Sequence, residues 1–337
     1  MAGIELVEHL ITARVPELMN PSNTIEVPLR IRVDPLTGDT GRLISGSKLA
    51  PSTRPDLEAL TAPPGFCPFC ADNIETATGV FDPALTAEGR IRRGEAWVFP
   101  NVLAYSEFSS VGIYTADQHF VDLPELTPTR VGDLLDALVA YTAAVQRHQP
   151  VWSSVNANYL PPAGSSLVHP HAQSAHDAVG TSVQRRLVGA SETWSGGESF
   201  WTTLIAQERQ SARWVGSYGR VAVFTPWAPV GFHEVWAVVE GEGRLEAMTA
   251  QDCADLGTAI SAVLMTYHAL NLTSFNWAIY GGGPTATDRY SLLCKIVSRS
   301  NAEPMYRSDV TYFEKLHGEA MVDLTPEEVA DLVRGFA

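Results

Sequence analysis

The chain has 337 residues, 45% of them hydrophobic and 18% charged, which is the composition of an ordinary globular protein with a large core. Its formal net charge of −15 excludes a general nucleic-acid binder, because counterion release from a polyanion requires a basic surface. A small phosphate ligand stays compatible with this charge, since a few local hydrogen-bond donors can hold it.

The first residues and the overall hydropathy also limit the class of protein. Residues 1–12 are mixed and acidic, without the basic start and apolar core of a signal peptide. No stretch approaches the run of about 18 apolar residues that a membrane-spanning helix needs. The four cysteines then indicate metal binding or free thiols rather than a disulfide framework. We expect a cytoplasmic location and no membrane partner.

The first local signal is a tight turn over residues 34–38 (Asp-Pro-Leu-Thr-Gly). Lys48 and Arg54 follow this turn, and both could contact a phosphate. A solvated surface position is the simpler interpretation of each side chain.

Cys67 and Cys70 form a C-x-x-C pair, whose thiolates could hold one edge of a tetrahedral zinc ion. A redox pair would be expected to open a helix after a strand, whereas a loop rich in proline precedes these cysteines; unliganded thiols are a further alternative. Because the chain has no second C-x-x-C, histidines must supply the other two ligands of a zinc site. We favour His119 and His169 for this role.

The next segment predicts strand, strand, helix and strand, over residues 95–105, 110–114, 123–147 and 151–160. Thr127 is the expected N-cap of the helix, and Leu134 and Leu138 belong to its apolar stripe.

Residues 169–173 (His-Pro-His-Ala-Gln) place two imidazoles and a carboxamide at alternate positions. On a strand, His169, His171 and Gln173 would share one face. A neutral imidazole with a fixed tautomer can attack phosphorus, and a carboxamide can donate to phosphoryl oxygens without adding a competing base. A metal-binding pair or a half-buried polar patch are the alternatives for so short a pattern.

The same series of elements recurs about 120 residues later. Strands are predicted over residues 219–225, 232–239, 274–280 and 289–297, and a helix over 249–270. Asn276 falls near the place of Asn158, and residues 181–197 are predicted to be a loop between the copies. We predict an α+β fold with antiparallel sheets and helices packed on one face, built from a duplicated unit. The second copy lacks the His-x-His, so the chemistry is expected in the first half. Chance similarity of two generic segments is the alternative.

Together these motifs resemble the galactose-1-phosphate uridylyltransferase family, within the histidine-triad superfamily. The resemblance covers about residues 25 to 335 and rests on residues 35–38, 67–70, 98–101, 117–126, Asn158 and residues 169–173. It implies two histidine-triad-type halves, over residues 1–195 with the catalytic and zinc sites and over 196–337 without the catalytic histidine. It also implies a homodimer.

The resemblance implies a role for each matching residue. Cys67, Cys70, His119 and His169 would bind one structural Zn²⁺ per chain. His171 would be the nucleophile, and Gln173, Ser165 and Asn158 would bind or assist at the phosphoryl group. Asn101 would line the nucleotide pocket, and Lys48 and Arg54 stand where the family carries an arginine pair.

The implied activity is transfer of a nucleoside monophosphate, with UMP expected, between phosphorylated small molecules through a nucleotidyl-histidine. The partners would be a nucleotide sugar or another nucleoside-diphosphate donor and a phosphorylated acceptor. A dinucleoside-polyphosphate phosphorylase and a non-catalytic, zinc-stabilised nucleotide-binding protein are the alternatives. Hydrolysis is less favoured because Gln173 stands where hydrolytic histidine-triad proteins carry a third histidine.

Two departures from the family limit this expectation. The family often carries a second metal on a His-x-His of the strand that here reads Leu292-Leu293-Cys294-Lys295, so we expect no second metal. The region of the hexose-phosphate contacts, residues 307–314, also differs, which puts galactose specificity in doubt.

Overall fold

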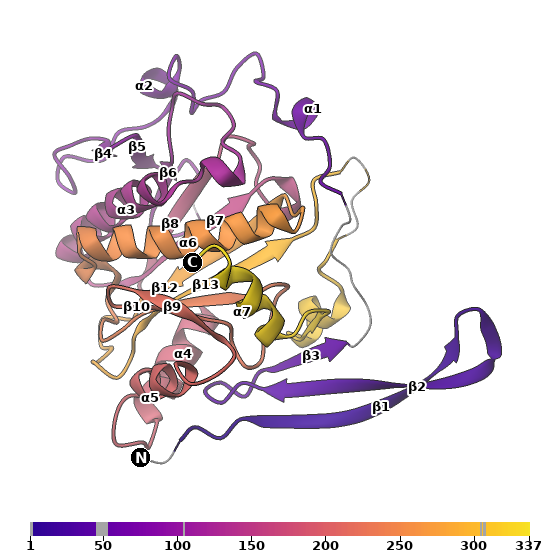
Figure 1. The fold of residues 1–337 in the computed structure, drawn as a ribbon. Coiled ribbons are helices and arrows are strands. Elements are labelled where there is room, and N and C mark those ends of the chain that lie inside the picture. The colour runs from indigo at the N-terminus through magenta and orange to yellow at the C-terminus, as the bar shows by residue number, and fades with distance from the viewer. Residues whose placement is uncertain (1–2, 45–52, 104, 304, 306–307) are drawn as a thin grey trace.

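The computed structural model describes residues 3–44, 53–103, 105–303, 305 and 308–337. Its main feature is a ten-stranded antiparallel sheet (Figure 1). From one edge to the other, the strands are β4 (Ile91–Arg93), β5 (Ala96–Pro100), β6 (Phe108–Ile113), β8 (His171–Asp177), β7 (Trp152–Tyr159), β12 (Ser274–Tyr280), β13 (Leu292–Arg299), β11 (Val235–Val239), β10 (Val221–Phe224) and β9 (Trp214–Tyr218).

The strand order is symmetric about the central pair of β7 and β12. Outward from the centre, β7-β8-β6-β5-β4 on one side matches β12-β13-β11-β10-β9 on the other. Each half also inserts one long helix between its third and fourth strands, α3 (Pro128–His148) in the first and α6 (Ala250–Ala269) in the second. This topology confirms the duplicated unit, and Asn158 and Asn276 are cross-strand partners in it. The division at residue 195 stays a prediction, because one continuous sheet joins the halves.

The two long helices lie side by side on one face of the sheet, as predicted (Figure 1). Each begins after a capping threonine, of which Thr127 was predicted: the Thr127 hydroxyl accepts from the backbone N–H of Arg130, and that of Thr249 from the N–H of Asp252. Leu134 and Leu138 of α3 join the large core beneath this face. The core therefore spans both halves of the chain.

Asp252, at the start of α6, holds that helix against strand β10. Both its carboxylate oxygens accept from Arg220, at 2.6 and 2.7 Å, and these bonds lower the pKa of the carboxyl from 3.8 to about 2. A lowered folded-state pKa gives stability that is complete above the unfolded pKa and is lost as the pH falls toward 2. We expect Asp252→Asn to cost about 2 kcal/mol at pH 7 and less as the pH falls from 5 to 3, measured by urea unfolding. Asp255→Asn, on the same helix, is the control; equal losses in both variants would contradict this account.

The expectation of a loop over residues 181–197 is wrong, because residues 182–193 form helix α4 (Ser182–Thr193). Thr181 and Gln184 make a capping box, with reciprocal bonds of 3.2 and 3.1 Å between each side chain and the other's backbone N–H. Leu187 and Val188 then pack with α5 (Phe200–Glu208) on the sheet face opposite α3 and α6. The capping signal was present in the sequence, but glycine-rich residues after it favoured a loop.

The strand expected over residues 95–105 ends at Pro100. The Asn101 carboxamide oxygen accepts from the backbone N–H of Leu103 at 2.9 Å, which turns the chain out of the sheet. Asn101 therefore lies on a loop between β5 and β6.

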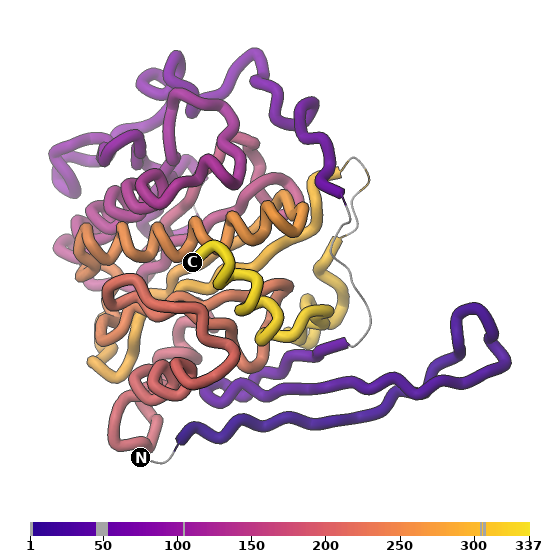
Figure 2. Tube along the Cα trace, viewed as in Figure 1, coloured from indigo at the N-terminus to yellow at the C-terminus, as the bar shows by residue number. Residues whose placement is uncertain are grey.

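A second sheet contains β1 (Val7–Glu17), β2 (Asn20–Val33), β3 (Thr40–Ile44) and β14 (Ala320–Val322). The β1–β2 hairpin projects from the body as a long arm (Figures 1 and 2). The turn predicted at residues 34–38 follows β2 and is confirmed, since the Asp34 carboxylate accepts from the N–H groups of Leu36 and Thr37.

The remaining short elements are α1 (Glu58–Thr61), α2 (Ile74–Ala77), α7 (Pro326–Arg334), η1 (Leu123–Glu125), η2 (Pro161–Ala163), η3 (Leu245–Ala247) and η4 (Phe313–His317). In the described part of the chain, no helix is both long and apolar enough to cross a bilayer.

Candidate active site

The sheet face opposite α3 and α6 is covered at two places. Near β5 and β6, the Cys67–Cys70 loop packs its Phe69 against Phe99 and Val111. Over β10 and β11, α4 and α5 form the other cover. Between the covers, the strands carry polar side chains on this face, namely Gln173, Asn156, Asn158, Asn276 and Lys295. We place the candidate site at this partly exposed polar strip in the middle of the sheet.

Cys67, Cys70, His119 and His169 converge at the edge of this strip, with their ligand atoms within 4.8 Å of one another. The Nδ1 atom of His169 lies 3.6 and 3.7 Å from the two sulfur atoms, and that of His119 lies 3.5 Å from the Cys70 sulfur. A tetrahedral zinc ion with Zn–S near 2.3 Å and Zn–N near 2.05 Å requires a sulfur–nitrogen separation of about 3.6 Å. The four residues therefore fit zinc in both donor type and spacing.

The surroundings prepare His169 for such a role. Its Nε2–H donates to the backbone oxygen of Thr115 at 2.8 Å, which leaves Nδ1 as the atom facing the cysteines. Burial lowers the pKa of His169 to about 4 and raises that of Cys70, next to Cys67, to about 11. The imidazole is thus neutral, as a metal ligand must be, and the Cys70 thiol gives up a proton when metal binds.

His171 begins strand β8, two residues beyond this cluster, and is only 6% exposed. Its Nδ1 lies 2.9 Å from the backbone oxygen of His169, which can only accept, so Nδ1 carries the proton. Burial lowers the pKa of the imidazole, which keeps it neutral. The ring of Phe69 contacts the edges of both histidines, with centroids 5.6 Å from His171 and 5.8 Å from His169. Because Nδ1 carries the proton, Nε2 of His171 is the ring nitrogen with a lone pair and is the nucleophilic atom.

Gln173 faces the same side of β8 as His171, and a hydrogen-bond chain fixes its direction. The Leu103 N–H donates to Asn101, whose amide donates to the Tyr105 hydroxyl at 3.2 Å, and this hydroxyl donates to the Gln173 oxygen at 3.0 Å. The backbone N–H of Leu103 can only donate, so it fixes the direction of Asn101, and the Tyr105 hydroxyl keeps its own hydrogen for the Gln173 oxygen. This arrangement leaves the Gln173 N–H₂ group for another acceptor. Tyr105 was missed by sequence analysis, which placed it in a strand; only the loop brings it to Gln173.

Asn158 and Ser165 lie before β8 in the chain. Asn156 is the cross-strand partner of Gln173, so Asn158, two residues on, lies beside His171 on the same face. The Asn158 oxygen accepts from Asn276 at 2.7 Å. Ser165 is buried in the turn after η2, where its hydroxyl donates to the backbone oxygen of Leu167 at 2.6 Å. Their contacts with a phosphoryl group stay predictions.

Arg54 lies away from these groups in its described contacts. It pairs with Asp122 at 2.5 Å and donates to the backbone oxygen of Leu272 at 3.1 Å. These contacts engage the guanidinium group within the protein, and a contact between Arg54 and a phosphate stays a prediction. Lys48 lies outside the described residues.

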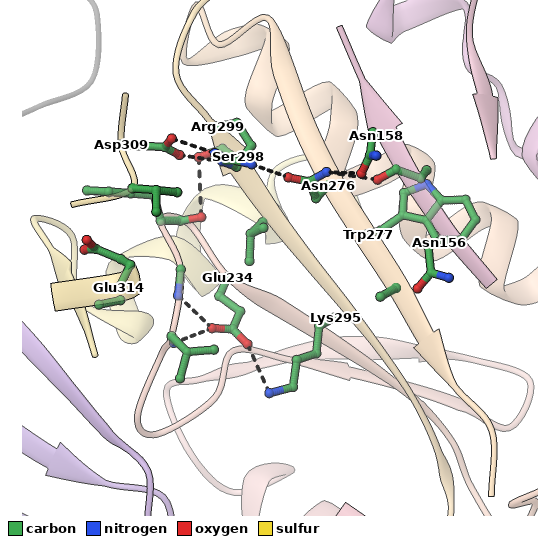
Figure 3. Close-up of a pocket in the computed structure, with 18 of the residues that line it drawn as sticks. Asn156, Asn158, Glu234, Asn276, Trp277, Lys295, Ser298, Arg299, Asp309 and Glu314 are labelled. Atoms are coloured by element: carbon green, nitrogen blue, oxygen red, sulfur yellow. Dashed lines mark hydrogen bonds and ion pairs between the residues drawn. The ribbon is translucent and has the colours of Figure 1, made fainter. Parts of the chain in front are cut away.

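A cavity of about 390 Å³ continues the polar strip into the second half (Figure 3). Asn156 and Asn158 of β7 line it on one side, and Lys295 of β13 on the other. The ammonium group of Lys295 lies 3.9 Å from the buried carboxylate of Glu234. Both halves of the chain thus contribute to this hollow, while the histidine pair belongs to the first half.

No family model matches this chain. An uncharacterised protein from Archaeoglobus fulgidus is 28% identical over 334 residues, which cover 98% of this chain and 96% of that protein. Among solved structures, an ADP-glucose phosphorylase from Arabidopsis thaliana with bound ADP-glucose matches 92% of this chain and 99% of its own, with a TM-score of 0.70 and 17% identity.

Two further structures agree with this match. A galactose-1-phosphate-uridylyltransferase-like protein from Arabidopsis thaliana has a TM-score of 0.69 and 18% identity, over 91% of this chain and 99% of its own. A uridylyltransferase has a TM-score of 0.65 and 21% identity, over 90% and 97%. These similarities confirm, at the level of the fold, the resemblance that the sequence motifs predicted.

Proposed function

We propose that this protein is a nucleotidyltransferase that moves a nucleoside monophosphate between phosphorylated small molecules through His171. The observation that carries the proposal is the tautomer of His171. Its Nδ1–H is held by the backbone oxygen of His169, which leaves a neutral, unprotonated Nε2 on a face lined with carboxamides.

The proposed reaction has two displacement steps. In the first, the Nε2 lone pair of His171 forms a bond to the α-phosphorus of a nucleoside-diphosphate donor. The bond from that phosphorus to the bridging oxygen breaks, and the electron pair leaves with the departing phosphate. In the second, a phosphate oxygen of the acceptor attacks the same phosphorus, and the phosphorus–nitrogen bond breaks to restore His171. Neither step requires net proton transfer, because a phosphate anion leaves in the first step and the neutral imidazole of His171 leaves in the second.

Each neighbouring side chain has a proposed part in this reaction. The N–H₂ groups of Gln173 and Asn158 would donate to the non-bridging oxygens, where negative charge accumulates in the transition state. Ser165 would assist there, and Asn101 would line the nucleotide pocket. Zn²⁺, when held by Cys67, Cys70, His119 and His169, supplies a structural cross-link without an open coordination position.

Nucleotide sugars are the donors that we favour. The Arabidopsis phosphorylase of the same fold binds ADP-glucose, and the sequence resemblance favours UMP transfer, so both bases enter the test. A dinucleoside-polyphosphate phosphorylase is the second candidate, and a nucleotide-binding protein without turnover is the third. The homodimer and the cytoplasmic location stay predictions of the sequence resemblance.

Mass spectrometry of the intact protein separates these candidates. We expect incubation with ADP-glucose or UDP-glucose to add the mass of one nucleoside monophosphate, and the added mass names the base. An adduct formed only from diadenosine tetraphosphate would favour the second candidate. Binding of the nucleotides without an adduct would favour the third.

Tyr105→Phe tests the contribution of the hydrogen-bond chain that ends at Gln173. The substitution keeps the ring but removes the hydroxyl that fixes the Gln173 oxygen. We expect adduct formation to slow by about 10-fold with little change in nucleotide affinity, because the misdirected donor acts mainly in the transition state. Rapid-quench measurement of adduct formation checks this, with Leu103→Ala in the same loop as the control for loop disturbance. An unchanged rate in Tyr105→Phe would remove this residue from the mechanism.

A further inference from the structure

A second hydrogen-bond chain reaches the candidate site from the half of the protein that lacks the histidine pair (Figure 3). The guanidinium group of Arg299, at the end of β13, binds both carboxylate oxygens of Asp309 at 2.6 and 2.9 Å. Its Nη1 donates to the carboxamide oxygen of Asn276 at 2.7 Å. The Asn276 Nδ2 in turn donates to the carboxamide oxygen of Asn158 at 2.7 Å.

The direction of this chain follows from its first member. A guanidinium group only donates hydrogen bonds, so the Asn276 oxygen must face Arg299. The Asn276 N–H₂ group then faces the backbone oxygens of Ala157 and Ala163, at 3.1 and 3.0 Å, which can only accept. One obligate donor and two obligate acceptors therefore exclude the flipped carboxamide of Asn276.

The orientation of Asn276 determines that of Asn158. The two hydrogens of the Asn276 Nδ2 are shared among three acceptors, namely the Asn158 oxygen and the backbone oxygens of Ala157 and Ala163. Because an amide nitrogen does not accept, the Asn158 oxygen must face it, and the Asn158 N–H₂ group is the end left for another acceptor. Among the hydrogen bonds of the described residues, none uses the Asn158 Nδ2 as a donor. Asn158 is two residues beyond Asn156, the cross-strand partner of Gln173, so the antiparallel register puts Asn158 opposite His171 on the same face of the sheet.

We propose that Arg299 and Asn276 are positioning residues that make Asn158 a donor toward an anionic oxygen of the nucleotide's phosphoryl group. This inference rests on the proposed function and adds a task for the second half of the chain. The second half lacks the histidine pair, but it holds the carboxamide of Asn158 with its N–H₂ group available to donate to a phosphate oxygen. A cation or an ammonium group would need the opposite orientation, with the Asn158 oxygen presented.

Asn276→Asp is the sharpest test, because it changes one N–H₂ group into an oxygen at constant shape. The carboxylate still accepts from Arg299, but it cannot donate to Asn158 or to the backbone oxygens of Ala157 and Ala163, a loss that the melting temperature reports. Asn158 must then turn its N–H₂ group toward residue 276 and present its oxygen to the phosphoryl group. Asn301→Asp is the matched control, since Asn301 also bonds within the second half, to Thr273 and to the backbone of Asn271, away from Asn158.

The measurements are the rate of adduct formation from ADP-glucose and UDP-glucose, the calorimetric affinity for AMP and UMP, and the melting temperature. We expect Asn276→Asp to slow adduct formation by about 100-fold, as expected for an inverted oxyanion donor, and to weaken monophosphate binding. Asn301→Asp should lower the melting temperature at least as much without slowing the adduct. In an Asn158→Ala background, Asn276→Asp should change the rate by less than about 3-fold, because the group it acts through is gone.

The possible outcomes separate the two proposals. Equal effects of Asn276→Asp with and without Asn158, or no effect, would show that the chain is only structural and overturn this inference. The proposed reaction would be overturned and the inference kept if the wild-type protein forms no adduct while the Asn276→Asp variant binds AMP or UMP less tightly than the wild-type protein. Both the proposed reaction and the inference would be overturned if the wild-type protein forms no adduct and Asn276→Asp leaves the affinity for AMP and UMP unchanged.

Discussion

Replacing His171 with Asn is expected to slow formation of the nucleotidyl adduct by at least about 10⁴-fold, because a carboxamide has no basic lone pair with which to attack phosphorus. Asn can still present an N–H group to the backbone oxygen of His169, which His171 contacts at 2.9 Å, so the local fold should persist. Intact-protein mass spectrometry measures the adduct, and peptide mapping of the wild-type protein locates it. The melting temperature and zinc content should stay close to those of the wild-type protein.

His176 provides the matched control for this substitution. It lies on the same strand, β8, but faces the core, where its two ring nitrogens lie 2.9 Å from the hydroxyls of Ser153 and Ser174. We expect His176→Asn to lower the melting temperature and to leave the adduct rate of the folded protein within a few-fold of the wild type. An adduct that survives His171→Asn, or maps to another residue, would contradict the proposed nucleophile.

The second large effect concerns the cluster of Cys67, Cys70, His119 and His169. We expect the purified protein to contain one zinc ion per chain, and Cys70→Ala to lose it and to melt about 5–10 °C lower. The physical reason is that the ion would join the Cys67–Cys70 loop to His119, 49 residues beyond Cys70 in the chain, and to His169, 99 residues beyond it. Without the ion, the Cys67–Cys70 loop would lose its cross-links to His119 and to His169, which lies two residues before His171. Elemental analysis and thermal unfolding with and without a chelator measure both quantities.

Cys253→Ala is the control for removal of a thiol. Cys253 is buried in α6, belongs to the large core and is not part of the cluster of two cysteines and two histidines. This variant should keep its zinc and its response to the chelator. A wild-type protein that holds no zinc after saturation, or whose melting temperature ignores the chelator, would contradict the proposed site.

Much of the fold follows from local signals. The N-caps at Thr127 and Thr249 were readable because a side-chain oxygen and a backbone N–H three residues later meet within one helical turn. The strand that ends at Tyr280 was readable because its buried positions alternate. Helix α4 carried such a signal at Thr181 and was still missed, since the glycines that follow favour a loop.

Some residues of the candidate site were likewise predictable from the sequence, and others were found only in the structure. The types of residue at positions 67, 70, 169, 171 and 173 pointed to zinc and phosphorus chemistry, because thiolates at C-x-x-C spacing can bind one zinc ion and alternate residues of a strand share one face. Tyr105 and Arg299 carried no comparable signal. Tyr105 bonds to Gln173, 68 residues away in sequence, and Arg299 bonds to Asn276, 23 residues away, and nothing local marks such a partner.

By itself, the sequence determined the kinds of chemistry available and the periodic elements that carry them, because propensity, capping and alternation act between residues close in the chain. Only the tertiary structure decided that β7 and β12 pair at the centre of one sheet, and that a directional chain from Arg299 ends on Asn158. A hydrogen bond's direction depends on which donors and acceptors meet in space, and that is fixed only when distant strands have taken their register.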